Sequence, residues 1–305
     1  MIELSDVQAA AARIEPHIHR TPVLSSRTLN AALGREVLFK GEHLQKTGSF
    51  KVRGALSAAL QLPPGTPGLV ALSSGNHAQG VAFAARVLGV PATIFMYDDS
   101  TDLKREAVRA YGAEVVDSPR ADGDVHAREY AAQRGFHFIH PYDDLHVMAG
   151  QGTQGLEFTE QLTDAPDAVL VAVGGGGMIS GIATVIKAVW PHTRVIGVEP
   201  TLADDARRSL ETGERVTLPA PPPTTIADGV RSLSVGALTF PVMQARVDEI
   251  VTASEDSIRA AHRLMMGHLK QVVEPTAALP IAPLLEGQNL PQRLGVFVCG
   301  GNWLP

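Results

Sequence analysis

Four consecutive glycines, at positions 174–177, are the first feature of the sequence that could do chemistry. They follow an apolar, strand-like run and open a helical pattern. Such a turn exposes backbone N–H groups at the positive end of a helix, an arrangement that suits a phosphate group. The structural alternative is an ordinary glycine-rich turn. We favour phosphate binding because four glycines in a row carry an entropic cost that a turn alone does not require.

A lysine in the stretch 46–55 could act as a nucleophile. Lys51 lies between Phe50 and Val52, and Thr47 or Ser49 can cap a helix that runs to about residue 62. Apolar neighbours and the positive end of a helix both lower the pKa of an amine and favour its neutral, nucleophilic form. Taken alone, however, these residues are more typical of a solvated surface lysine.

Two further stretches stand at the ends of expected strands. Residues 73–80, Ser-Ser-Gly-Asn-His-Ala-Gln-Gly, join a strand to a helix and are rich in hydrogen-bond donors. They could cradle a carboxylate, or they could form a plain capped turn. Cys299 follows the apolar run at 296–298, at the carboxyl end of a strand, where open α/β sheets bind ligands. The alternative for Cys299 is a buried core cysteine.

A nicotinamide cofactor is the alternative from another class of enzyme. Gly175 and Gly177 begin a dinucleotide fingerprint, but Ser180 stands where its third glycine belongs. Glu199, at the end of the next expected strand, could serve as the ribose-binding acid. A nicotinamide-dependent dehydrogenase therefore stays open at this point, as does an amino-acid-binding sensor without catalysis, which would leave Lys51 unexplained.

The elements that must position these residues alternate between strands and helices. The pattern predicts strands at 70–72, 92–96, 114–116, 136–139, 168–173, 195–198 and 296–298, and helices at 77–88, 101–111, 125–134, 178–189 and 258–268. Strands that alternate with helices of this length indicate parallel sheets. Because the pattern restarts after residue 142, we expect two α/β sheets.

Composition excludes several classes of protein. The 305 residues carry a net charge of −6 and no run of Lys or Arg, so we expect no nucleic-acid partner. The longest apolar runs, such as 168–173, fall far below the ~18 residues of a membrane span, and the N-terminus lacks a secretory pattern, so we expect no membrane association. A single cysteine cannot form an internal disulfide. These features predict a cytoplasmic protein.

The four stretches together form the set of parts that pyridoxal phosphate needs to act on an amino acid. With them the chain resembles the fold type II, or β-family, pyridoxal-phosphate enzymes, and most closely the threonine/serine dehydratases and serine racemases. The matching stretches run in order over nearly the whole chain, at residues 46–55, 73–80, 140–144, 149–153, 174–177, 226–230, 274–276 and 299–302.

The resemblance implies an architecture. It predicts an α/β fold with two open, twisted, parallel-sheet domains like those of the tryptophan synthase β subunit. Residues 1–67 and 143–305 would form a large domain that binds the cofactor, and residues 68–142 a small domain that closes over the substrate. The family is commonly homodimeric. Because the motifs reach residue 302, we expect no C-terminal regulatory domain.

The resemblance also implies roles for individual residues. Lys51 would hold the cofactor and later remove the Cα proton of the substrate. Cofactor contacts would come from Phe50, Asn76, Gly174, Gly175, Gly176, Gly177, Met178 and Cys299, with Asn76 at the 3-hydroxyl oxygen, the glycines at the phosphate and Cys299 facing the pyridine nitrogen. The substrate is expected to be a small amino acid whose carboxylate meets Ser74, Asn76 and His77.

The reaction that follows is β-elimination of water from L-threonine or L-serine, which yields a 2-oxo acid and ammonia. A thiol at Cys299 carries no fixed negative charge, so the pyridine ring stays largely neutral and suits prompt elimination. Two alternatives lie in the same family: a serine racemase, in which Ser74 would be the second acid/base, and a 3-hydroxyaspartate dehydratase. An arginine used by animal serine racemases has no clear counterpart around residues 121–124.

A divalent cation is the last expectation drawn from the resemblance. Glu199, the carbonyl of Ala203 and Asp205 would be its protein ligands, with waters completing the shell of Mg, Mn or Ca. The alternative is that these acidic residues stabilise the first turn of a helix.

Overall fold

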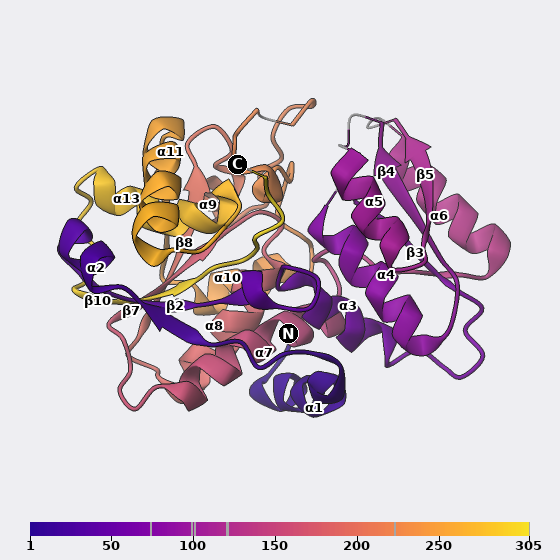
Figure 1. Ribbon diagram of the computed structural model, residues 1–305, viewed down its shortest axis with the longest axis horizontal. Helices are drawn as coiled ribbons and strands as arrows, with labels where there is room; N and C mark the ends of the chain where they lie inside the picture. Colours follow the sequence, from indigo (N-terminus) through magenta and orange to yellow (C-terminus); the bar gives the residue numbers. More distant parts are fainter. Residues whose placement is uncertain (74, 99, 101, 120–121, 223, 305) are drawn as a thin grey trace.

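The strands of the chain form two separate sheets in the computed structural model, which describes residues 1–73, 75–98, 100, 102–119, 122–222 and 224–304. Figure 1 shows them as two lobes, the smaller at the right of the view. The strands are β1 (Val23–Ser25), β2 (Glu36–Lys40), β3 (Leu69–Leu72), β4 (Ala92–Tyr97), β5 (Glu114–Ser118), β6 (His137–Phe138), β7 (Ala168–Ala172), β8 (Arg194–Pro200), β9 (Glu249–Ala253) and β10 (Arg293–Phe297).

The larger sheet has six strands in the order β1-β2-β10-β7-β8-β9. All its neighbours are parallel except β1, which pairs with β2 in antiparallel fashion, Val23 opposite Lys40. The expectation of two parallel sheets is confirmed, and β1, which the sequence did not predict, adds an antiparallel strand at one edge. An antiparallel edge strand on an otherwise parallel sheet is common, since the edge strand has only one neighbour to match.

The smaller sheet has four parallel strands in the order β5-β4-β3-β6. All of them come from one continuous part of the chain, residues 69–138. The hydrophobic alternation between strand and helix thus predicted the existence and the separation of two sheets correctly. It missed β1, β2 and β9, whose runs are short or mixed with charged residues.

The helices are α1 (Leu4–Ile14), α2 (Arg27–Leu33), α3 (Lys51–Ala59), α4 (Asn76–Leu88), α5 (Asp102–Ala110), α6 (Gly123–Arg134), α7 (Leu145–Gln161), α8 (Gly177–Val189), α9 (Asp205–Thr212), α10 (Thr239–Arg246), α11 (Glu255–Leu264), α12 (Pro275–Ala278) and α13 (Ala282–Leu285). As expected, α4 and α6 end at left-handed glycines, Gly89 and Gly135. Within the described residues, no helix is both long and apolar enough to cross a membrane.

Helix α3 begins later and ends earlier than the sequence predicts. Its first residue is Lys51 and its last is Ala59, and neither Thr47 nor Ser49 caps it. The reason lies in the preceding chain: Ser49 forms a β-bridge with Gly300, and the Phe50 N–H donates to the carbonyl of Cys299 at 3.0 Å. Pairing with the end of β10 keeps these residues out of the helix.

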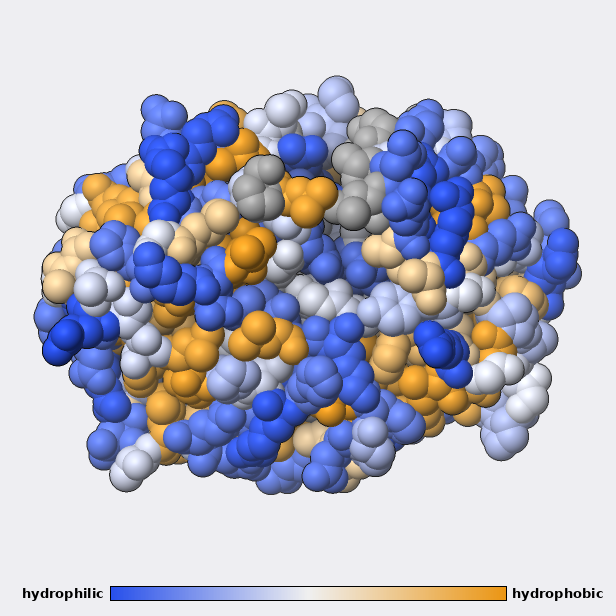
Figure 2. All heavy atoms as spheres, viewed as in Figure 1, coloured by the Kyte–Doolittle hydropathy of each residue, from blue (hydrophilic) through white to orange (hydrophobic). Residues whose placement is uncertain are grey.

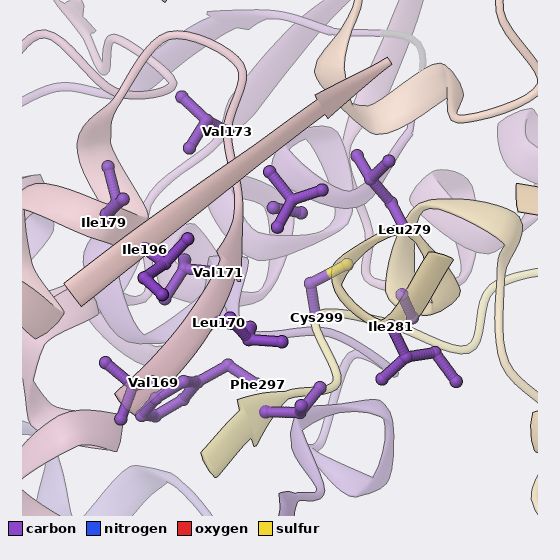
Figure 3. Packing of buried hydrophobic residues seen from close by; sticks show 14 of the residues in the cluster. Val169, Leu170, Val171, Val173, Ile179, Ile196, Leu279, Ile281, Phe297 and Cys299 are labelled. Carbon is purple, nitrogen blue, oxygen red and sulfur yellow. The ribbon is translucent and has the colours of Figure 1, made fainter. Parts of the chain in front are cut away.

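The packing of helices α8, α7 and α3 joins the larger lobe to the smaller one. Helix α7 packs against α8 and α3, and α3 packs against α4 of the smaller lobe. The largest apolar cluster surrounds β7, β8 and β10, and Figure 3 shows part of it, including Leu170, Ile196 and Phe297. A second cluster joins α3 and α4 to β3 and β4. Phe50 belongs to the first cluster and Val52 to the second, so Lys51 stands between the two cores.

Candidate active site

A cavity of about 650 Å³ lies between the two lobes. Figure 2 shows the surface hollowed between them. All the described residues that the sequence assigned to a cofactor or substrate line this cavity: Phe50, Lys51, Asn76, His77, Gly174, Gly175, Gly176, Gly177, Met178 and Cys299. Ser74, the expected second acid/base, lies outside the described residues.

Lys51 presents its amine to this cavity from the first turn of α3. Its Nζ donates a hydrogen bond to the carbonyl of Pro141 at 2.8 Å and lies 5.2 Å from the centre of the Phe50 ring. Desolvation by burial lowers the pKa of Lys51 to about 8, against a smaller opposing effect of Cys299 and Glu274. The sequence expected a lowered pKa from the helix end and apolar neighbours, and desolvation proves to be the main cause.

The glycine loop turns its carbonyl groups toward the protein. The Gly175 carbonyl accepts from Gly236 N and from the Thr239 hydroxyl, and the Gly176 carbonyl accepts from Ser180 N. In contrast, the N–H groups of residues 174–176 find no acceptor in the described part of the chain. These free donors at the N-terminus of α8 are what an anionic phosphate requires.

Packing also explains why these positions are glycine. A Cβ on Gly175 would lie 2.4 Å from ring carbons of Tyr142, and one on Gly177 would lie 2.9 Å from the Tyr142 Cβ. Gly176 has a φ of +89°. The glycine run therefore serves the close approach of Tyr142 as well as the exposure of its N–H groups.

Asn76 and His77 begin α4, where the first backbone N–H groups have no partner within the helix. The Asn76 side chain donates to Glu274 and accepts from Asn302. His77 Nε2 lies 2.9 Å from the carbonyl of Ile139, so Nε2 carries the proton and Nδ1 is an acceptor. Burial lowers the pKa of His77 to about 3, and the neutral ring cannot donate to a carboxylate through Nδ1. Backbone N–H groups are the better candidates for that task.

Cys299 lies where the chain continues past β10, among the core side chains shown in Figure 3. Its thiol donates to Glu274 Oε1 at 3.4 Å. Burial raises the pKa of this thiol well above its ordinary value, so it stays neutral. The sequence indicates no role for Glu274 beyond its place in the matching stretch at residues 274–276. The structure places its carboxyl between Cys299 and Asn76.

The expected cation ligands lie apart from this cavity lining. Glu199 is fully buried and accepts from the backbone N–H groups of Ala206 and Arg207 at 3.0 and 2.8 Å. Glu199 does not line the cavity beside the glycine loop, which removes the main support for a nicotinamide site. Asp205 is also buried, and its Oδ2 has no hydrogen-bond partner in the described residues. Burial raises the pKa of Asp205 to about 7 and that of Glu199 well above its ordinary value.

Comparison with known proteins agrees with this geometry. A family model described as "Pyridoxal-phosphate dependent enzyme" matches residues 14–300. The chain belongs to this family. Sites in the family are built around pyridoxal phosphate, and the free loop N–H groups, the buried amine of Lys51 and the neutral thiol of Cys299 fit that group.

Three similar proteins have different names. An L-threo-3-hydroxyaspartate ammonia-lyase of Pseudomonas sp is 45% identical over 97% of this chain and 94% of its own length. A serine racemase of Mus musculus is 43% identical over 93% of this chain and 85% of its own. The crystal structure of a threonine deaminase from T.th. has a TM-score of 0.96 at 52% identity and covers 100% of both chains.

The pKa of Lys51 leads to a prediction about cofactor capture. An amine must be unprotonated to attack an aldehyde, so capture of pyridoxal phosphate by the apoprotein should speed up with rising pH and level off just above pH 8. A solvated lysine would level off near its ordinary pKa of about 10.4. Stopped-flow absorbance over a pH series measures this rate, and a midpoint close to the ordinary lysine value would contradict the assignment.

Proposed function

We propose that this enzyme eliminates water from small L-β-hydroxy amino acids, L-threonine and L-serine, and releases a 2-oxo acid and ammonia. One observation carries the proposal: the buried amine of Lys51, with its lowered pKa, shares a cavity with the loop at 174–177. The free N–H groups of that loop can bind an anion. The neutral thiol of Cys299 adds support, because it offers no anion that would stabilise a protonated ring.

Each residue has a task in this proposal. Pyridoxal phosphate, when bound, withdraws electrons from the Cα of the amino acid attached to it. Lys51 would hold the cofactor, and its Nζ would take up the Cα proton of the substrate. The N–H groups of the glycine loop bind the phosphate, and those at the start of α4 orient the substrate carboxylate. The carbonyl of Pro141 keeps Nζ in the cavity.

Product analysis tests the proposal. L-threonine should yield 2-oxobutyrate and ammonia in equal amounts, and Lys51→Ala should lower this rate by about 10³-fold or more, because positioned proton transfer contributes on this order. Lys46→Ala, an exposed lysine on the same stretch, is the matched control and should keep its activity. Formation of D-serine from L-serine in excess of pyruvate would favour the racemase instead, with Ser74 as the second acid/base.

A second candidate substrate is 3-hydroxyaspartate, which carries a distal carboxylate. Four described cationic side chains line the cavity: Lys51, Lys104, Arg128 and Arg231. Lys104 pairs with Asp228 and Arg128 with Asp124, each at 2.7 Å. Arg231 forms no ion pair within the described residues and bonds only the carbonyl of Thr225. A half-buried guanidinium with spare N–H groups suits a carboxylate.

Substitution of Arg231 tests this candidate. Arg231→Gln should lower kcat/KM for L-threo-3-hydroxyaspartate by about 10- to 100-fold, the value of a charged hydrogen bond, and change that for L-threonine by no more than a few-fold. Arg231→Lys should keep part of the preference. Arg128→Gln is the control, since that cation already has a carboxylate partner. A parallel loss for both substrates would show that Arg231 serves only the structure.

We also propose a divalent cation at Glu199, the carbonyl of Ala203 and Asp205. Two carboxyl groups buried close enough to repel one another, one with an unpartnered oxygen among the described residues, are what a hard cation would stabilise. The backbone N–H bonds of Glu199 are the competing, purely structural explanation.

Thermal unfolding separates the two explanations. Mg, Mn or Ca at about 100 times its Kd should stabilise the protein by about 2.7 kcal/mol, which corresponds to a rise of several degrees in Tm. Asp205→Asn should abolish that rise. Sodium chloride at equal ionic strength is the control, and an equal rise with sodium would contradict a specific site.

A further inference from the structure

Glu274 stands at the centre of the cofactor-facing residues, although neither the motifs nor the proposed reaction gives it a task. Its side chain is buried and lines the cavity. Its two carboxyl oxygens lie 2.9 and 3.0 Å from Asn76 Nδ2, and Oε1 lies 3.4 Å from Cys299 Sγ. One carboxyl group thus contacts both of the side chains expected at the 3-hydroxyl oxygen and at the nitrogen of the ring.

The hydrogen bonds around Asn76 leave its amide a single orientation. Asn76 Oδ1 accepts from Asn302 Nδ2 at 2.8 Å, and Asn302 Nδ2 also donates to the carbonyl of Thr47 at 2.9 Å. Because Asn302 must donate, Asn76 must turn its oxygen toward Asn302 and its nitrogen toward Glu274. One of the two Nδ2 hydrogens then serves Glu274, and the other remains for a ligand.

The backbone is shaped to hold Glu274 in this place. Its N–H donates to the carbonyl of Gly300 at 3.1 Å, and a Cβ on Gly300 would lie 2.6 Å from Glu274 Oε1. Glu274 also occupies the N-cap position of α12, yet its carboxyl makes no capping bond there. The side chain is therefore committed to Asn76 and Cys299 rather than to the helix end.

We propose that Glu274 is a positioning residue for the cofactor ring, which orients Asn76 and Cys299 through one carboxyl group. The proposal rests on the proposed placement of those two residues at the cofactor. Its physical basis is preorganisation: side chains already fixed in the binding orientation lose less rotamer freedom when the ligand arrives.

The charges around Glu274 are compatible with this task. Lys51, Lys104 and Asp228 face it from three different elements. Burial raises the pKa of Glu274 to about 7. Either protonation state can accept from Asn76, since even a neutral carboxylic acid keeps a carbonyl oxygen.

Binding of pyridoxal phosphate to the apoprotein tests the proposal without turnover. Glu274→Ala should raise the Kd about tenfold, which corresponds to the loss of one or two hydrogen bonds, and should shift the absorbance maximum of the bound form. Glu274→Gln, which keeps one acceptor oxygen, should raise it less. Glu286→Ala, which removes a carboxylate that accepts from Ser254 N, is the control and should leave both readouts unchanged.

A double-mutant cycle with Asn76→Ala separates positioning from a general loss of structure. If Glu274 acts through Asn76, the increase in Kd from Glu274→Gln should largely vanish in the Asn76→Ala background. Additive effects, or a wild-type Kd and spectrum for both Glu274 variants, would overturn the proposal. If the unaltered protein binds the cofactor normally but releases no ammonia from L-threonine or L-serine, the proposed function fails while the role of Glu274 can stand. The two failures are therefore distinguishable.

Discussion

A buried group of four charges ties the site to the rest of the molecule. Arg53 is fully buried and donates to Glu42 at 2.6 and 2.8 Å and to Glu157 at 2.8 and 3.0 Å, while Lys40 donates to Glu157 at 2.6 Å. Removal of one partner from such a group costs about 3–5 kcal/mol, because it leaves an uncompensated charge in the interior. The end of β2, the turn after it, α3 and α7 are therefore constrained together. Arg53 lies two residues after Lys51, so this constraint also sets where the reactive amine stands.

Close helix packing carries that placement to the smaller lobe. A Cβ on Gly150 of α7 would lie 2.6 Å from the carbonyl of Arg53, and a Cβ on Gly80 of α4 would lie 3.1 Å from the carbonyl of Lys51. Glycine at 150 is thus required for α7 to approach α3 this closely, and a side chain at Gly80 would force α4 to shift by a few tenths of an ångström. As a result the N-terminus of α4, with Asn76, reaches the same cavity as Lys51. The glycines of this chain thus serve helix contacts as well as ligand-facing turns.

The sequence predicted the local features better than the contacts between them. Two sheets and the helices that end at Gly89 and Gly135 follow from periodicity, turn residues and helix ends, which are properties of neighbouring residues. The lowered pKa of Lys51 depends mainly on its burial in the folded chain. The start of α3 was mispredicted because Ser49 pairs with Gly300, a partner about 250 residues away. Glu274, Asn302 and Arg231 could not be assigned tasks for the same reason: each acquires its role from a distant contact. Their only signal in the sequence was membership in, or proximity to, the matching stretches.

Much of the charge around the site is paired or neutralised, with Arg231 as the exception among the described cations of the cavity lining. Lys104 and Arg128 are already paired with carboxylates, His77 is held neutral, and the thiol of Cys299 stays protonated. In the proposed function, backbone N–H donors at the starts of α4 and α8 would bind the anionic groups. This arrangement matters for Lys51, since a carboxylate ion placed beside it would raise the pKa of its amine and keep it protonated. Glu274 is a carboxyl group that acts on Lys51 in this way, and burial raises the pKa of Glu274 to about 7, which weakens that effect. The same desolvation that raises the pKa of the acid thus helps keep the amine nucleophilic.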